Sequence, residues 1–362
     1  MVCPCRDGTG EMAAQPRELN LTLTPRSRYD AIDVAARVRQ EFDDALSPFR
    51  CVLYCSLHTT AGYLEQSLSS RLDNRRERLD PFMRAFQELF PPGADYRHDQ
   101  LHLRCELSED KRQCEPRNAD SHLTFIGSGL RNCVTYLHRP GEPVYFTDLD
   151  GVYAGQPRTR CTRVLGYTAE ETVARDRCEV PVSRHPIDSV NLADPRIGVL
   201  SRAQELVSGH GVARGRIDIA LAASERDAGV TVNEYETLLM RHDLAEVLAD
   251  PLKFAARTGA RMLRDPLSIP SKSWGYARYD VVQVVNELMD ALKVTESALE
   301  RLLARVMAVP ARRFLRLKRS LSLLVSDTGG IVRGTYQNPI LIQWAGAPKG
   351  GRTLELTLTR FR

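Results

Sequence analysis

Two stretches far apart in the chain share one pattern. The first runs from Cys51 to Tyr63 and reads CVLYCSLHTTAGY, so that apolar, β-branched and aromatic residues lead to His58. This pattern predicts a buried strand that delivers an imidazole to a turn. The second runs from Arg216 to Glu234 and also has a strand-like run before Ala-Gly, with Glu225 in place of the histidine. The two stretches predict two related units in one chain.

Length and composition fit a globular protein with two domains. The chain has 362 residues, of which 43% are hydrophobic and 27% charged. No apolar run approaches the ~20 residues of a membrane helix, and the N-terminus lacks a signal-peptide core, so we expect a cytoplasmic protein. Nine cysteines, all before residue 179, favour reduced thiols. The net charge of +4 is mild for this length, which argues against a nucleic-acid partner. One basic run, residues 312–319, could touch phosphate, but a solvated or oligomer-facing surface is its commoner meaning. The lack of a long apolar run argues against a membrane partner.

The predicted elements follow the same order in both halves, which indicates a tandem duplication. We divide the chain into a disordered leader (1–16), a first domain (17–168), a linker (169–182) and a second domain (183–362). In the first domain, residues 123–166 are typical of a meander of strands broken at glycines. In the second domain, helices are predicted over residues 235–248 and 280–307.

Short polar motifs follow the His58 turn in the first domain. They are Tyr96-Arg97-His98-Asp99, Asn118-Ala119-Asp120-Ser121-His122 and Asp148-Leu149-Asp150-Gly151, with Arg158 after them. Together with His58-Thr59-Thr60-Ala61 they resemble the YjbQ-type family, whose members are described as secondary thiamine-phosphate synthases. The first domain departs from the family pattern in two places, because Gln66-Ser67 stands for Asn-Glu and Gly141-Glu142-Pro143 stands for Gly-Thr-Trp-Gln.

The second domain keeps the motifs that the first has lost. It retains Thr231-Val232-Asn233-Glu234 and Gly334-Thr335-Tyr336-Gln337, but it has no histidine at the matching positions. The resemblance therefore implies an α+β fold of two tandem YjbQ-like β-sandwich domains with flanking helices. The family is similar to small proteins that associate as trimers, which implies a homo-oligomer.

Complementary loss predicts one composite site shared by the two domains, within a chain or across neighbours. The alternatives are a second domain that is only a structural partner, and an accidental repeat. The residues that we expect to carry the chemistry are His58, His98, His122, Asp148, Asn233 and Glu234. Those that we expect to bind phosphate are Thr59, Thr60, Arg158, Arg160, Gly334, Thr335 and Gln337. The Gly334-Thr335 turn would offer backbone N–H groups to an anion.

His58, His98 and His122 would form a face of three imidazoles suited to a divalent metal, Zn²⁺ or Mg²⁺, with Asp148 completing or orienting the shell. Without metal, the same imidazoles would serve as general acids or bases near neutral pH. A rival is a structural zinc knot within residues 98–114, built from His98, His102, Cys105 and Cys114.

The reaction implied by the resemblance joins a pyrimidine-methyl diphosphate to a thiazole phosphate. Because diphosphate leaves while positive charge grows on carbon, cations and N–H donors that hold the diphosphate would lower the barrier. More broadly, we expect a transferase or lyase that acts on a phosphorylated small molecule. The alternative is a non-catalytic oligomeric binding protein with the same fold.

Overall fold

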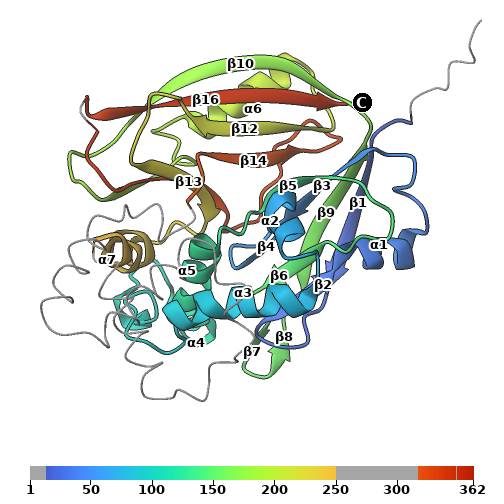
Figure 1. The fold of residues 1–362 in the computed structure, drawn as a ribbon. Coiled ribbons are helices and arrows are strands. Elements are labelled where there is room, and N and C mark those ends of the chain that lie inside the picture. The colour runs from blue at the N-terminus through green and yellow to red at the C-terminus, as the bar shows by residue number, and fades with distance from the viewer. Residues whose placement is uncertain (1–13, 250–316, 348) are drawn as a thin grey trace, which may run out of the picture.

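The computed structural model describes residues 14–249, 317–347 and 349–362, and the fold is α+β, as predicted. We call residues 14–168 the first half and the remaining described residues the second half. The first half holds nine strands and five α-helices, with a short 3₁₀ turn (Figure 1). Its elements are β1 (Arg17–Leu23), β2 (Asp30–Asp33), α1 (Val34–Phe42), β3 (Cys51–Ser56), β4 (Ala61–Gly62), α2 (Gln66–Arg71), α3 (Arg76–Leu89), η1 (Leu101–Leu103), α4 (Glu109–Cys114), α5 (Ala119–Ser128), β5 (Cys133–Leu137), β6 (Tyr145–Asp148), β7 (Val152–Tyr153), β8 (Gln156–Pro157) and β9 (Arg160–Tyr167).

The second half uses seven strands among its described residues, with fewer described helices. Its elements are β10 (Glu170–Pro181), β11 (Asp188–Asn191), α6 (Val199–Gly209), β12 (Gly215–Leu221), β13 (Ala228–Asn233), η2 (Leu239–Asp243), α7 (Leu244–Ala249), β14 (Ser320–Val325), β15 (Asn338–Gln343) and β16 (Gly351–Phe361). Here η2 is a turn of π-helix. The predicted helix at 280–307, the basic residues 312–316 and leader residues 1–13 lie outside the described residues.

The two halves repeat one strand order. In the first half a four-stranded sheet runs β1-β9-β3-β5 and a three-stranded sheet runs β2-β6-β4. In the second half the sheets run β10-β16-β12-β14 and β11-β15-β13. Once the small β7–β8 hairpin is set aside, the strands of each half occupy the same places in the same chain order. All of these pairs are antiparallel.

The strands follow from alternation in the sequence. In β12 every second residue is buried, as expected for a strand with one face on a core, and β16 repeats that pattern over most of its length. In α3 the apolar residues Leu79, Met83 and Phe86 recur at helical spacing and are buried. A sheet built in this way buries one of its faces on a core. The helices α3 and α5 contact each other, as Figure 1 shows.

The prediction of strands immediately after residue 123 is wrong, because α5 extends from Ala119 to Ser128. Every residue of α5 is buried, so its polar and apolar positions show no amphipathic period that would distinguish a short helix from a strand. Gly129, which we took as a break between strands, ends the helix in a left-handed conformation with φ of 75°.

The predicted linker, residues 169–182, instead contains the strand β10. All along its length β10 pairs with β16, with a shift in register between Thr172 and Ala174. It lies at the edge of its sheet and exposes many charged side chains, so its composition resembled that of a loop.

The halves share packing as well as topology. One hydrophobic cluster joins Leu123 and Phe125 of α5 to Leu239 of η2 and Ile340 of β15. Near the end of the chain, the rings of Tyr167 and Phe361 stack with their centroids 3.9 Å apart. The helix α5 thus lies between the halves, where β13 approaches it in Figure 1.

Two predictions on environment can be compared with the described residues. None of their helices is both long enough and apolar enough to cross a bilayer. The seven cysteines within the described ranges are free thiols, in agreement with the expectation of reduced cysteines.

Candidate functional site between the two halves

Histidines of the first half meet acidic and amide side chains of the second half at α5. His98 precedes η1 and His122 lies on α5, and their rings pack edge to face with centroids 5.4 Å apart. Asn233 ends β13, and Glu234 and Glu236 follow it. The structure therefore brings together four predicted residues, His98, His122, Asn233 and Glu234.

His122 is held in one tautomer. Its Nδ1 lies 2.7 Å from Oδ1 of Asn233, while Nδ2 of Asn233 donates to the Thr59 carbonyl and Oδ1 also accepts the Glu234 N–H. Because the Asn233 oxygen can only accept, Nδ1 of His122 carries the proton. Its Nε2 then presents a lone pair.

That lone pair has no hydrogen-bond partner among the described residues, although the side chain is fully buried. The nearest recorded charged atom is Oε2 of Glu234, 3.6 Å away. Burial, and then the charge of neighbouring His98, lower the pKa of His122 to about 3. His122 is therefore a neutral base in a dry environment.

His98 has the opposite character. Its Nδ1 lies 3.0 Å from Oε2 of Glu236, and its Nε2 lies 3.3 Å from Oδ1 of Asn118. The Asn118 amide nitrogen donates to Asp150, so its oxygen faces His98 and both ring nitrogens of His98 act as donors. Burial opposes the charged form, but the hydrogen bond that His98 donates to Glu236 and the charge of Glu234 prevail and raise the pKa of His98. His98 is an imidazolium beside a neutral imidazole.

Backbone contacts fix both imidazoles. Asp243, in the π-helical turn η2, accepts from the N–H groups of Arg97 and His98, each at 2.9 Å. Asp99 accepts from the Ala119 N–H at 3.0 Å and so caps the helix that carries His122. The motif Tyr-x-His-Asp thus places one imidazole and supports the helix of the other.

The third predicted histidine, His58, faces a different group. Its Nε2 accepts from the Cys161 N–H at 2.7 Å, and its Nδ1 lies 3.5 Å from the Arg160 guanidinium. Burial, followed by the positive charge of Arg160, lowers the pKa of His58 to about 3. His58 therefore fastens a turn to β9, and its imidazole does not complete a face with His98 and His122.

Arg158 and Arg160, predicted to bind phosphate, neutralise aspartates instead. Arg160 is 4% exposed and makes two hydrogen bonds to Asp148, of 2.6 and 2.9 Å, while Arg158 pairs with Asp150. Because Asp150 also accepts from Asn118, this network supports His98 from behind. Asp148 is fully buried and acts through Arg160.

Two further predicted phosphate ligands, Gly334 and Gln337, hold the His58 turn in place. Gln337 donates through Nε2 to the carbonyls of Ser56 and His58, at 3.0 and 2.8 Å, and accepts the Gly334 N–H at 2.9 Å. A Cβ at Gly334 would collide with the Leu57 carbonyl. The prediction of an anion cradle is therefore wrong for the Gly334 amide, which is already bonded.

The threonines have separate environments. The recorded contacts of Thr59 and Thr60 at the site use their carbonyls, which accept from Asn233 and from Leu149. Thr335 is exposed on the clamping loop.

The predicted metal sites are not assembled. Within the described ranges, no group of three or more His, Cys, Asp or Glu side chains is arranged to hold a metal ion. Of the three imidazoles predicted to share a metal, His58 accepts a backbone N–H and His98 faces Glu236 and Asn118, so His122 alone has an unengaged nitrogen. The rival zinc knot is not formed either, since Cys105 and Cys114 are exposed whereas His98 is buried.

Sequence reasoning missed two charged residues of the site. Glu236 is the carboxylate that faces His98, and its position two residues after Glu234 was the only clue. Arg104, which is 2% exposed, pairs with Glu234 at 3.2 Å and comes from a segment without a recognisable motif. Neither contact can be read from local sequence, because each joins residues more than 100 positions apart.

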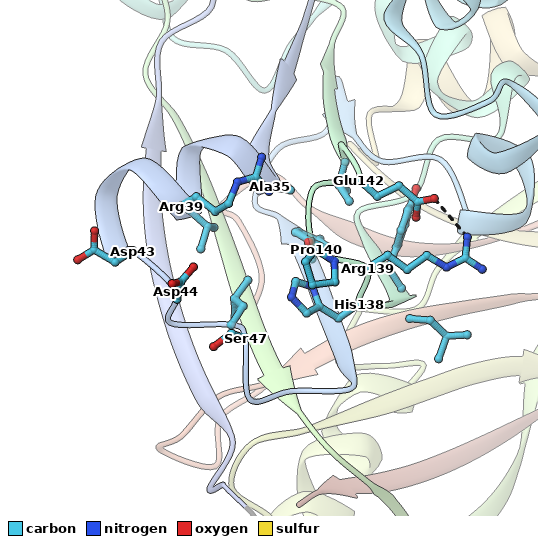
Figure 2. Close-up of a pocket in the computed structure, with 15 residues that line it drawn as sticks. Ala35, Arg39, Asp43, Asp44, Ser47, His138, Arg139, Pro140 and Glu142 are labelled. Atoms are coloured by element: carbon cyan, nitrogen blue, oxygen red, sulfur yellow. Dashed lines mark hydrogen bonds and ion pairs between the residues drawn. The ribbon is translucent and has the colours of Figure 1, made fainter.

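A surface hollow of about 60 Å³ lies elsewhere, between α1 and the loop from β5 to β6. Figure 2 shows His138 and Pro140 beside it and an ion pair between Arg139 and Glu142. It has room for about two water molecules, and none of the predicted site residues lines it. We therefore place the candidate site at the buried cluster.

Comparisons with known proteins give structural neighbours only. No protein-family model matches the chain, and no curated protein matches it. A solved YbjQ-like protein of unknown function from Sulfolobus solfataricus P2 is 20% identical and covers 53% of this chain and 99% of its own, with a TM-score of 0.29. A YjbQ/UPF0047 family protein from Clostridium acetobutylicum is 14% identical, covers 51% and 98%, and has a TM-score of 0.23. A hypothetical protein from Aeropyrum pernix K1 is 16% identical, covers 51% and 98%, and has a TM-score of 0.28.

Proposed function

We propose that the chain is a tandem duplication of a YjbQ-like unit, and that the contact between its halves is the general-base site of an enzyme acting on a phosphorylated small molecule. The repeated strand order supports the duplication. The hydrogen bond that His122 donates to Asn233, and the one that Asn233 donates to the Thr59 carbonyl, support a site that needs both halves.

One observation carries the proposed function, namely the unpartnered Nε2 of His122. A buried polar atom without a hydrogen bond destabilises a fold by about 1–3 kcal/mol. Asn233 nevertheless holds the ring so that this lone pair faces Glu234. General-base catalysis requires a fixed, unprotonated base with a free lone pair. Because the pKa of His122 is about 3, proton transfer to it becomes favourable only as the positive charge that develops on the nucleophile lowers the pKa of the proton it gives up.

The protonation states of His122 and His98 define the role of each in the proposed reaction. A nucleophile that carries a proton gives it to Nε2 of His122 as it forms its bond to carbon. The carbon–oxygen bond to the phosphate or diphosphate breaks, and the leaving group takes the electron pair. Both nitrogens of His98 are engaged, so His98 contributes its positive charge to the stabilisation of the leaving group and donates no proton.

The diphosphate implied by the resemblance provides the first assay. Because the nitrogen of a thiazole carries no proton, the general-base role is tested with water as the nucleophile: purified protein would be given a hydroxymethylpyrimidine diphosphate alone, with diphosphate release as the readout. His122→Asn keeps a donor near Nδ1 for Asn233 and removes Nε2, so we expect turnover to fall by about 10²–10⁴-fold. His102→Asn, at an exposed histidine of the first half, is the matched control and keeps turnover. Wild-type turnover in the folded His122→Asn protein would contradict the proposal.

Closure of the site to solvent favours one alternative, a non-catalytic binding protein. His122 and Asn233 have no exposed surface, and Arg104 is nearly covered. A protein that holds its ligand without turnover would bind the phosphorylated compounds stoichiometrically and release no diphosphate. That result would replace the enzymatic proposal with the binding proposal.

A further inference from the structure

Residues 100–117, which we call the strap, carry one buried cation into the site. The strap contains η1 and α4, and its Arg104 has a side chain only 3% exposed. Each nitrogen of the guanidinium faces a different carboxylate. Nε lies 2.7 Å from Glu106, one terminal nitrogen lies 3.2 Å from Glu115, and the other lies 3.2 Å from Glu234.

The strap is tied to the site at both ends. His98 lies just before it and Asn118 just after it, and these two side chains contact each other. Within the strap, Arg112 donates to the Arg104 carbonyl at 3.3 Å. Tyr153, on β7, donates to the Glu115 carbonyl at 3.3 Å. The position of Arg104 therefore depends on the same residues that hold His98.

The three carboxylates around Arg104 are not equivalent. Glu234 belongs to the second half, has a side chain 17% exposed, and also faces Nε2 of His122 at 3.6 Å. Glu106 and Glu115 belong to the strap, and their side chains are 52% and 26% exposed. The inner side of the guanidinium thus faces the proposed base, and its outer side faces carboxylates that can turn toward water.

We propose that Arg104 recognises the phosphate or diphosphate of the substrate, and that this group replaces Glu106 and Glu115 while Glu234 keeps its contact. The inference rests on the proposed function, since it assigns the anion-binding residue of the same site. A guanidinium presents its donors in a planar fork that matches phosphate oxygens. Ion pairs with exposed partners contribute little, so their exchange for phosphate oxygens costs little.

The exchange accounts for the surplus of negative charge around Arg104. One cation among three carboxylates is a poor site for an anion as long as all three remain in place. Departure of Glu106 and Glu115 leaves Arg104 with Glu234 and the incoming phosphate. Because Glu234 spans Arg104 and His122, the bound phosphate lies across the guanidinium from the proposed base, with Glu234 between Arg104 and His122. Glu106 and Glu115 therefore act as competitors that a phosphate must displace.

Calorimetric titration of the full chain with inorganic diphosphate tests the exchange. The double variant Glu106→Gln and Glu115→Gln removes both competing charges at solvent-accessible positions, so we expect about tenfold tighter binding. Arg104→Lys keeps the charge but loses the fork, and Arg104→Ala loses both, so we expect progressively weaker binding. Glu109→Gln is the matched control, because Glu109 lies on the same strap with a side chain 76% exposed. Its affinity stays within about twofold of wild type.

Three results would overturn the inference. They are unchanged or weaker diphosphate binding by the double variant, unchanged binding by folded Arg104→Lys, and no measurable binding by wild type and double variant alike. A purely structural Arg104 would give the first result, because loss of its partners would not create affinity. Diphosphate binding that depends on Arg104, together with full turnover in His122→Asn, would refute the general-base role and leave the role of Arg104 standing.

Discussion

His58 and Glu225 occupy equivalent places in the two halves, yet their surroundings differ. His58 accepts the Cys161 N–H at 2.7 Å, and Glu225 accepts the Thr353 N–H at 2.9 Å. Beside each lies a buried arginine, Arg160 at the start of β9 and Arg352 near the start of β16. Arg160 contacts His58 at 3.5 Å, and Arg352 contacts Glu225 at 3.0 Å.

The partners of these arginines separate the two turns. Arg160 is held by the carboxylate of Asp148, and the neighbouring Asp150 continues through Asn118 toward His98. Arg352 is held by Gln343 at 3.1 Å and by the carbonyl of Ala345 at 2.6 Å. Each turn needs only a side chain that accepts a strand N–H and an arginine beside it. The hydrogen-bonded network that reaches the imidazole of His98 also needs the carboxylates of Asp148 and Asp150, which belong to the first half. One turn therefore serves the site, and the other serves stability.

Truncation of the two equivalent residues should have unequal effects on the free energy of unfolding. Glu225→Ala leaves Arg352, whose side chain is 3% exposed, without a compensating carboxylate, and we expect a loss of about 3–5 kcal/mol. His58→Ala removes a neutral acceptor while Arg160 keeps Asp148, so we expect about 1–3 kcal/mol. Denaturant unfolding of both variants measures the difference.

His58→Gln and Glu225→Gln are the matched controls, because each keeps a side-chain acceptor for the strand N–H. We expect both to lose less than the alanine variants. Equal losses of unfolding free energy in the two alanine variants would contradict this difference between the two turns.

Acid should destabilise the fold through two buried histidines of the first half, His58 and His122. The pKa of His58 and that of His122 are lowered from 6.5 to about 3 in the folded state. The unfolded chain therefore binds these protons first, and stability falls as pH drops from 6.5 toward 3. Each histidine contributes about 1.4 kcal/mol per pH unit within that window. His98, with its raised pKa, contributes stability that is present below 6.5 and is lost as pH rises through its folded pKa.

Urea unfolding at a series of pH values measures these slopes. We expect His58→Gln and His122→Asn each to flatten the dependence below pH 6.5 by about one proton. A slope that both variants leave unchanged would contradict the assignment of two neutral buried histidines.

The sequence predicted which residues of the two halves lie close together more accurately than it predicted what each residue does. Short motifs with fixed order were enough to place His98 and His122 near Asn233. They could not show that His58 accepts a backbone N–H, because the chemical pattern around a histidine is the same whether it binds a ligand or a strand. Arg104 was missed because its partner Glu234 is 130 residues away.

The two errors in the predicted fold concern segments whose local sequence does not indicate their structure. The helix α5 is buried on all sides and so carries no amphipathic period, which led to a prediction of strands. The strand β10 is an edge strand rich in charge, which led to a prediction of a linker. In both segments, tertiary packing decided the structure, and local composition did not.

The protonation of His98 and His122 is the most direct test of the account. Nitrogen-15 NMR of the imidazoles in the full chain at pH 7, with His98→Gln and His122→Asn to assign the signals, measures the state of each ring nitrogen. We expect two protonated nitrogens in His98, and in His122 a protonated Nδ1 together with an unprotonated Nε2. A doubly protonated His122, or one with its proton on Nε2, would contradict the claim that Asn233 holds a neutral base at the contact between the halves.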